Sequence, residues 1–145
     1  MSKTLLYGAT KIDETNAAYA AVASLEQFQW KNRVFVVIAD RDNFRAARQE
    51  NQLLADRAAL EERDMVILKL AGSSITPLFG SGDGLDGEAL RQELDMPDTG
   101  EFVAFLLGKD GSVKLKASEP ITSDELFAII DSMPVRAAET VRHDK

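Results

Sequence analysis

The sequence predicts an α/β domain in which a mixed four-stranded sheet, a parallel pair plus an antiparallel hairpin, is flanked by helices. Two short apolar runs, 33–39 and 65–70, are separated by one amphipathic stretch, which is the spacing of a parallel strand–helix–strand unit. A third apolar run, 102–107, precedes a tight turn and an alternating segment, 112–118, which is typical of a hairpin. One more helical stretch then follows.

Composition limits the kind of protein. The chain has 145 residues, the size of one domain with its own core. Its formal net charge of −7 argues against a nucleic-acid partner. No stretch approaches the ~20 apolar residues of a membrane-spanning helix, so we expect no membrane insertion. Because there are no cysteines, disulfides, thiol catalysis and iron–sulfur clusters are excluded within this chain.

We interpret residues 1–24 as an N-terminal extension that is partly helical. Residues 4–7 form either a short edge strand or a loose end, and the alanine-rich stretch 15–28 favours a helix. Trp30 is expected to cap the core. The start of the chain lacks the apolar run of a signal peptide, which predicts a cytoplasmic protein; the alternative is a periplasmic or secreted one whose leader was removed.

The run 33–39 is rich in β-branched residues and reads as a strand buried on both faces. Asp42 or Asn43 is placed to cap the next helix, which we expect to run to about Arg63. Its apolar stripe is predicted from helical spacing. The residues of that stripe are Phe44, Ala47, Leu54 and Ala58, with Leu53 and Leu60 beside it.

Residues 71–86 are expected to form a long loop, a length that is uncommon unless the loop is functional or mobile. Its glycines lack the lysine of a phosphate-binding P-loop. Asp83, Asp86 and Glu88 offer calcium-type oxygens, but not in the order of an EF-hand, so we expect no metal. Asp86 is placed to cap a short helix over 87–96 that buries Leu90 and Leu94.

The strand Val113–Ala117 alternates lysines with apolar residues, which suits an exposed sheet edge. This edge is one candidate surface for forming a homo-oligomer. Thr122 and Glu125 are spaced as a capping box for the last helix, and residues 137–145 form a polar tail. Charges at element ends are expected to form ion pairs that tie helix to sheet. These charges are Arg33, Glu62, Arg63, Asp64 and Lys109.

A parallel pair, a hairpin and a closing helix make up the thioredoxin-like three-layer sandwich. Five segments, in order, also resemble an uncharacterised domain of many small bacterial proteins, which recurs in sushi-repeat-containing extracellular matrix proteins of animals. They are Phe28-x-Trp30-Lys31-x-Arg33-Val34, Leu60-x-Glu62-Arg63-Asp64, Leu85-Asp86-Gly87-x-x-Leu90-Arg91, Gly108-Lys109-Asp110-Gly111-x-Val113-Lys114-Leu115 and Pro120-Ile121 through Leu126-Phe127-x-x-Ile130-Asp131-x-Met133-Pro134-x-Arg136. The resemblance covers residues 25–136 and implies a thioredoxin-like fold distantly similar to peroxiredoxins, without an established activity.

In redox-active thioredoxin-like proteins, the nucleophilic cysteine follows the first central strand, at a helix N-terminus that lowers the pKa of its thiol. Here that place holds Asp40, Arg41, Asp42 and Asn43, which cannot attack a disulfide or a peroxide. Free backbone N–H groups with Arg41 and Arg45 nearby are able to hold a small anion. The candidate ligand site is therefore Arg41, Asp42, Asn43 and Arg45, with ordinary helix capping as the alternative.

The sequence thus favours a non-redox binding or scaffold domain with no cofactor and an unknown protein or small-molecule partner. The rival is a thiol-independent enzyme or anion-binding protein that uses residues 40–43 and the 71–86 loop. The single histidine, His143, lies in the tail, where nothing fixes it as a general base.

Overall fold

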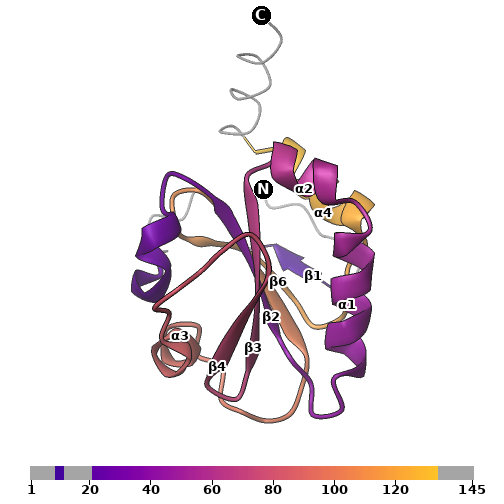
Figure 1. Ribbon diagram of the computed structural model, residues 1–145. Coiled ribbons are helices and arrows are strands. Elements are labelled where there is room, and N and C mark those ends of the chain that lie inside the picture. Colours follow the sequence, from indigo (N-terminus) through magenta and orange to yellow (C-terminus); the bar gives the residue numbers. More distant parts are fainter. Residues whose placement is uncertain (1–8, 12–20, 134–145) are drawn as a thin grey trace, which may run out of the picture.

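A mixed sheet forms the centre of the protein, with helices on both faces (Figure 1). The structure, a computed structural model, describes residues 9–11 and 21–133. Within them the sheet has six strands in the order β1-β6-β5-β2-β3-β4. The strands are β1 (Ala9–Lys11), β2 (Arg33–Ile38), β3 (Met65–Ala71), β4 (Ser74–Phe79), β5 (Val103–Leu107) and β6 (Val113–Ala117). The helices are η1 (Ala23–Phe28), α1 (Phe44–Leu54), α2 (Arg57–Glu62), α3 (Gly87–Glu93) and α4 (Ser123–Asp131).

The predicted thioredoxin-like fold class is confirmed. Strand β2 pairs in parallel with β3 and antiparallel with β5, which in turn pairs antiparallel with β6. Every residue of β2 is buried, and its side chains alternate between two cores. Phe35 and Val37 pack in the core that includes residues of α1, α2 and α4, while Val34 and Val36 pack in the core that includes residues of η1 and α3.

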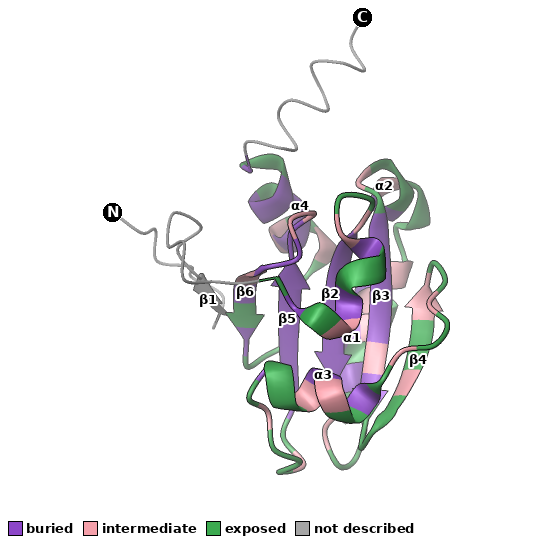
Figure 2. Ribbon diagram, turned by 90° about the vertical axis from the view of Figure 1, so that its left-hand side faces the viewer, coloured by how far each residue is buried: buried purple, intermediate pink, exposed green. Residues whose placement is uncertain are grey.

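The sheet has two more strands than predicted, and the first of them is β4. The stretch 71–86 was expected to be one long loop, which is wrong. Strand β4 forms a hairpin with β3, with Leu70 opposite Ile75 and Lys69 opposite Thr76. Figure 2 shows it as a largely exposed edge strand, in contrast to the buried central strands β2 and β5. The sequence signal is weak because Pro77 sits inside the strand and proline is a poor sign of one.

The other additional strand is β1, which runs antiparallel along β6 and places Thr10 opposite Lys116. The expectation that Val113–Ala117 is a free edge is therefore wrong, since β1 already covers it. An oligomer through that edge would have to displace β1. The remainder of the 1–20 stretch, the tail 137–145 and His143 lie outside the described residues.

The helix predicted to run from 44 to 63 is two helices, α1 and α2, because Asp56 leaves the helical region with φ −129° and ψ 61°. Its predicted apolar stripe is also out of phase. The buried residues of α1 are Ala46, Gln49 and Leu53, whereas Phe44 is 76% exposed. Helix α1 is therefore rotated about its axis relative to the expectation.

The segment before β2 also differs from the expectation. The described part of the predicted 15–28 helix is the 3₁₀-helix η1, which buries Leu25 and Phe28. Trp30, expected to cap the core, is 68% exposed. Its φ of 67° turns the chain between η1 and β2, and its N–H donates to the Lys109 carbonyl.

Two helix starts are as predicted. Asp86 Oδ1 accepts the N–H groups of Glu88 and Ala89 at 3.1 Å, so α3 begins at its expected cap. Thr122 and Glu125 form a capping box at the start of α4. Helix α3 ends at Glu93 rather than near Met96.

Candidate functional site

The carboxyl end of β2, where open α/β sheets bind their ligands, carries a shallow hollow of about 370 Å³. The buried strand β2 ends here, and the turn formed by residues 40–43 leads from it into α1. The lining comes from three segments far apart in the sequence. It consists of Ala39, Asp40, Arg41, Ala71, Gly72, Asp98 and Gly100.

Asp40 fills the position just before the N-terminus of α1. Its Oδ2 accepts the N–H of Arg45 and its Oδ1 accepts the N–H of Ala46, both at 3.1 Å. Partial burial raises the pKa of Asp40, but the backbone N–H groups around the carboxylate outweigh it and hold the pKa below the ordinary value of 3.8. A carboxylate thus occupies the place where an external anion would meet these groups.

Asp42 and Asn43 do not cap α1, so this prediction is wrong. Asn43 is the N-cap residue, but with φ 62° it makes no side-chain capping bond. Asp42 is exposed. The cap comes from Asp40, three residues earlier than a standard N-cap, which is why the usual spacing rule missed it.

The two candidate arginines lie at this end and contact other parts of the protein. The N–H of Arg41 donates to the Gly100 carbonyl at 2.9 Å, and its guanidinium lies against Gly100. Arg45 Nε lies 3.4 Å from Glu119 Oε2, and both side chains are about half exposed. The structure therefore brings Arg41, Asp42, Asn43 and Arg45 to one end of the sheet without converging them on one point.

Phe44 is the residue of this end whose role sequence reasoning missed. It is the first residue of α1, directly after the turn, and it is 76% exposed. Helical spacing assigned it to the core, since an aromatic residue in an amphipathic helix is usually buried. Only the rotation of α1, set by tertiary packing, places it in solvent.

Groups of three or more metal-ligating side chains are absent from residues 9–11 and 21–133. Asp86 was one of the three carboxylates considered as a calcium ligand. Its Oδ1 accepts the two N–H groups that cap α3. In the same described stretches, no helix is long and apolar enough to cross a membrane.

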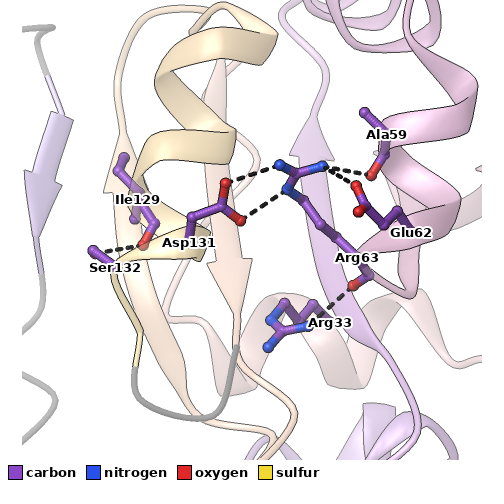
Figure 3. Close-up of polar contacts among 7 residues, drawn as sticks. All are labelled: Arg33, Ala59, Glu62, Arg63, Ile129, Asp131 and Ser132. Atoms are coloured by element: carbon purple, nitrogen blue, oxygen red, sulfur yellow. Dashed lines mark hydrogen bonds and ion pairs between the residues drawn. The ribbon is translucent and has the colours of Figure 1, made fainter. Parts of the chain in front are cut away.

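The charges at the opposite end form the expected ion pairs, as Figure 3 shows for Arg63. Arg63 Nη2 lies 2.8 Å from Asp131 Oδ2 and its Nε donates to Oδ1, so α4 is tied to the end of α2. The guanidinium also lies 4.3 Å above the ring of Phe127. Arg33, which is buried, donates through Nη1 to the Arg63 carbonyl. Together these contacts join α4, the end of α2 and the start of β2.

The family is settled by sequence comparison. Residues 24–139 match the family described as Domain of unknown function (DUF4174). The chain belongs to this family. The expected resemblance to an uncharacterised domain is thereby confirmed, over nearly the predicted range.

An animal relative of the DUF4174 chain is coiled-coil domain-containing protein 80 of the zebrafish, Danio rerio. The two are 30% identical over 132 residues, which cover 79% of this chain and 15% of the zebrafish protein. The chain therefore corresponds to a small part of that relative, and the activity of the whole protein does not transfer to it.

Two solved structures share the fold. A DsbF homologue from Corynebacterium diphtheriae has a TM-score of 0.62 at 12% identity, covering 92% of this chain and 98% of the other. The reduced 2-Cys peroxiredoxin of Plasmodium vivax has a TM-score of 0.53 at 21% identity, covering 80% and 84%. At these identities the likeness shows the fold alone.

Proposed function

We propose that this chain is a non-redox binding domain that docks a polypeptide partner at the carboxyl end of β2. Thiol chemistry is not available to it, because the sequence contains no cysteine. The same end of the sheet is the usual ligand position in open α/β folds. The proposal concerns binding and assigns no reaction.

The observation that carries the proposal is that a capping carboxylate, Asp40, and an exposed aromatic side chain, Phe44, occur together at the start of α1. In the redox relatives of this fold, the start of α1 serves a thiolate, whereas here Asp40 satisfies the N–H groups of Arg45 and Ala46. That leaves Phe44 in solvent beside the turn of 40–43. An exposed aromatic next to mixed charges is the composition of a protein-binding hot spot.

The charges around Phe44 favour a polypeptide over a small ion. Arg41 and Arg45 are exposed, and so are Asp42 and Asp98. This end of the sheet therefore carries exposed charges of both signs, as the polar rim of a protein interface does. The hollow behind the turn is shallow, which suits a single anchoring side chain of the partner.

The test is a selection of displayed random peptides on the immobilised chain, followed by affinity measurements on the selected peptides. We expect Phe44→Ala to weaken their binding about tenfold or more, as removal of an anchoring aromatic does. Asn51→Ala is the control, because it truncates another exposed side chain of α1, two turns further along the helix, outside both proposed docking surfaces. Peptides that bind both variants equally well would contradict the proposal.

The rival function, a small-anion site on Arg41, Asp42, Asn43 and Arg45, predicts stabilisation by phosphate, sulfate or citrate. A ligand of the native state raises the melting temperature. We expect no such shift in a thermal-shift screen, since the Asp40 carboxylate already accepts the N–H groups of Arg45 and Ala46. A saturable rise with one of these anions would favour the rival.

A further inference from the structure

A second hollow, of about 530 Å³, lies at the opposite end of the sheet, beside the amino ends of β2 and β3. Its apolar lining includes Phe28, Met65 and Val66, all of which are buried. Its rim includes the polar Asn32 and Asp64. An apolar floor with a polar rim suits a long amphipathic side chain, whose stem is apolar and whose tip is polar.

The charged side chains that line the hollows at this end are carboxylates. Glu61 and Asp64 line the hollow, and an adjoining hollow of about 510 Å³ is lined by Glu61, Glu62 and Asp64 together with Ala58. Asp64 pairs with Lys109 at 2.7 Å, and Glu62 with Arg63 at 3.3 Å.

Glu61 is different from these paired carboxylates. It is exposed, and the structure gives it no ion pair with any described residue. Its carboxylate lines both hollows, and among the described residues no cation is paired with it. Complementarity of charge favours a cation as the group that docks here.

Trp30 adds an aromatic surface to this end. It is the single tryptophan of the chain and is 68% exposed. It lies in sequence midway between Phe28 and Asn32, both of which line the hollow. Its φ of 67° is a left-handed backbone conformation that a bulky residue rarely adopts. Trp30 does not line either hollow, but an exposed aromatic face at the same end of the sheet is a surface on which a guanidinium or ammonium group can stack.

We propose that this end of the sheet docks a basic segment of a partner polypeptide. An arginine or lysine stem lies on the apolar floor, its cation meets Glu61, and Trp30 flanks the segment. Arginine suits the position best, since its planar guanidinium both pairs with carboxylates and stacks on rings. This docking surface lies at the other end of β2 from the Phe44 surface and does not depend on it.

The experiment uses Trp30 as its own reporter, since its emission is the only tryptophan signal of the full chain. The probe is the peptide acetyl-Ala-Arg-Leu-Arg-Ala-amide. The matched probe carries citrulline in place of both arginines, which keeps the shape and removes the charge. We expect a saturable change in emission with the arginine peptide and binding about tenfold weaker with the citrulline peptide.

Two variants locate the binding. Glu61→Gln should weaken binding of the arginine peptide about threefold, as loss of one exposed ion pair does, whereas Glu101→Gln, the same loss of charge before β5 at the far end, should not change it. Trp30→Gly, followed by calorimetry, should also weaken binding while the melting temperature holds or rises, because glycine adopts a positive φ without strain. The proposal is overturned by no saturable response, equal binding of the two peptides, or equal binding by Glu61→Gln and Glu101→Gln.

Discussion

The side chain of Asp40 decides which chemistry is available at the start of α1. Where a redox protein keeps a thiolate, this chain keeps a carboxylate that accepts the N–H groups of Arg45 and Ala46. The backbone N–H groups lower the pKa of Asp40 despite its partial burial. The Asp40 carboxylate is thus used to begin helix α1.

This assignment predicts how stability depends on pH. Because the pKa of Asp40 is lower in the folded chain, its contribution is complete above the ordinary value of 3.8 and is lost as the pH falls through the folded value. Asp40→Ala should lower the free energy of unfolding by about 1 kcal/mol at neutral pH, the usual effect of removing a cap. Urea denaturation at a series of pH values measures both quantities.

Asp40→Asn is the control, since its amide oxygen still accepts a hydrogen bond but does not titrate. We expect this variant to lose less stability than Asp40→Ala at neutral pH and to show a shallower loss below the ordinary pKa. Asp110 contributes to the acid sensitivity that remains. Burial raises the pKa of Asp110, but hydrogen bonds from Ser112 and Lys114 outweigh it, so the pKa lies below its ordinary value. A variant as acid-sensitive as the wild type would exclude Asp40 as a stabilising carboxylate.

Among the elements, α1 is positioned by a polar contact rather than by an apolar stripe alone. Gln49 is completely buried, and its Nε2 donates to the Ile121 carbonyl at 2.7 Å. The N–H of Ile121 donates back to Gln49 Oε1 at 2.8 Å. The amide therefore fastens α1 to the segment that leads into α4.

Gln49→Leu should destabilise the protein by about 1–3 kcal/mol, because it leaves the buried N–H and carbonyl groups of Ile121 without partners. Asn51→Leu on the same helix is the matched control, since Asn51 is exposed. We expect the control to unfold within about 0.5 kcal/mol of the wild type. Chemical denaturation of both variants measures the difference, and equal stabilities would show that the Gln49 contact is dispensable.

Helix α3 depends on a glycine. A Cβ atom on Gly87 would lie 2.1 Å from the Ser73 carbonyl oxygen in the β3–β4 turn, so the first residue of α3 can approach the hairpin only without a side chain. Gly87→Ala should cost about 1–3 kcal/mol, the usual range for overpacking. The adjacent Glu88→Ala should change stability little, because Glu88 is exposed. Thermal denaturation measures the effect. If Gly87→Ala melted at the same temperature as the wild type, the close approach of α3 to the hairpin would be contradicted.

The elements that were predicted correctly are those stabilised by their own local sequence. Runs such as 33–39 and 102–107 are buried on both faces, so composition alone identified the central strands. The caps Asp86 and Thr122 accept N–H groups within the first turn of their own helices, so their sequence spacing predicted them as well. The orientation of α1 depends on the contact of Gln49 with Ile121, and η1 is held by the N–H of Ser24, which donates to Glu93 Oε1; both contacts join residues far apart in sequence. The cap of α1 was missed because Asp40 lies three residues before the standard N-cap position. Strand β4 was missed because it contains Pro77, which argues against a strand.

For the molecule as a whole, the two edges of the sheet decide whether another chain can add a strand to it. An unpaired edge is a template for association with another strand. The β4 edge contains Pro77, which brings no N–H to a further strand. The other edge is formed by β1, which pairs along Ala117, Lys116 and Leu115 of β6. Each edge therefore has a feature that limits strand addition.

Removing β1 should reveal the self-association surface that the sequence indicated at Val113–Ala117. Deletion of residues 1–11 leaves the N–H and carbonyl groups that β1 had paired without partners, and a second copy can then pair with them. In sedimentation velocity we expect the full chain to behave as one species and the truncated chain to associate with increasing concentration. A synthetic peptide of residues 5–14 should suppress that association by restoring the strand, whereas a truncated chain that stays monomeric would show that β6 needs no cover.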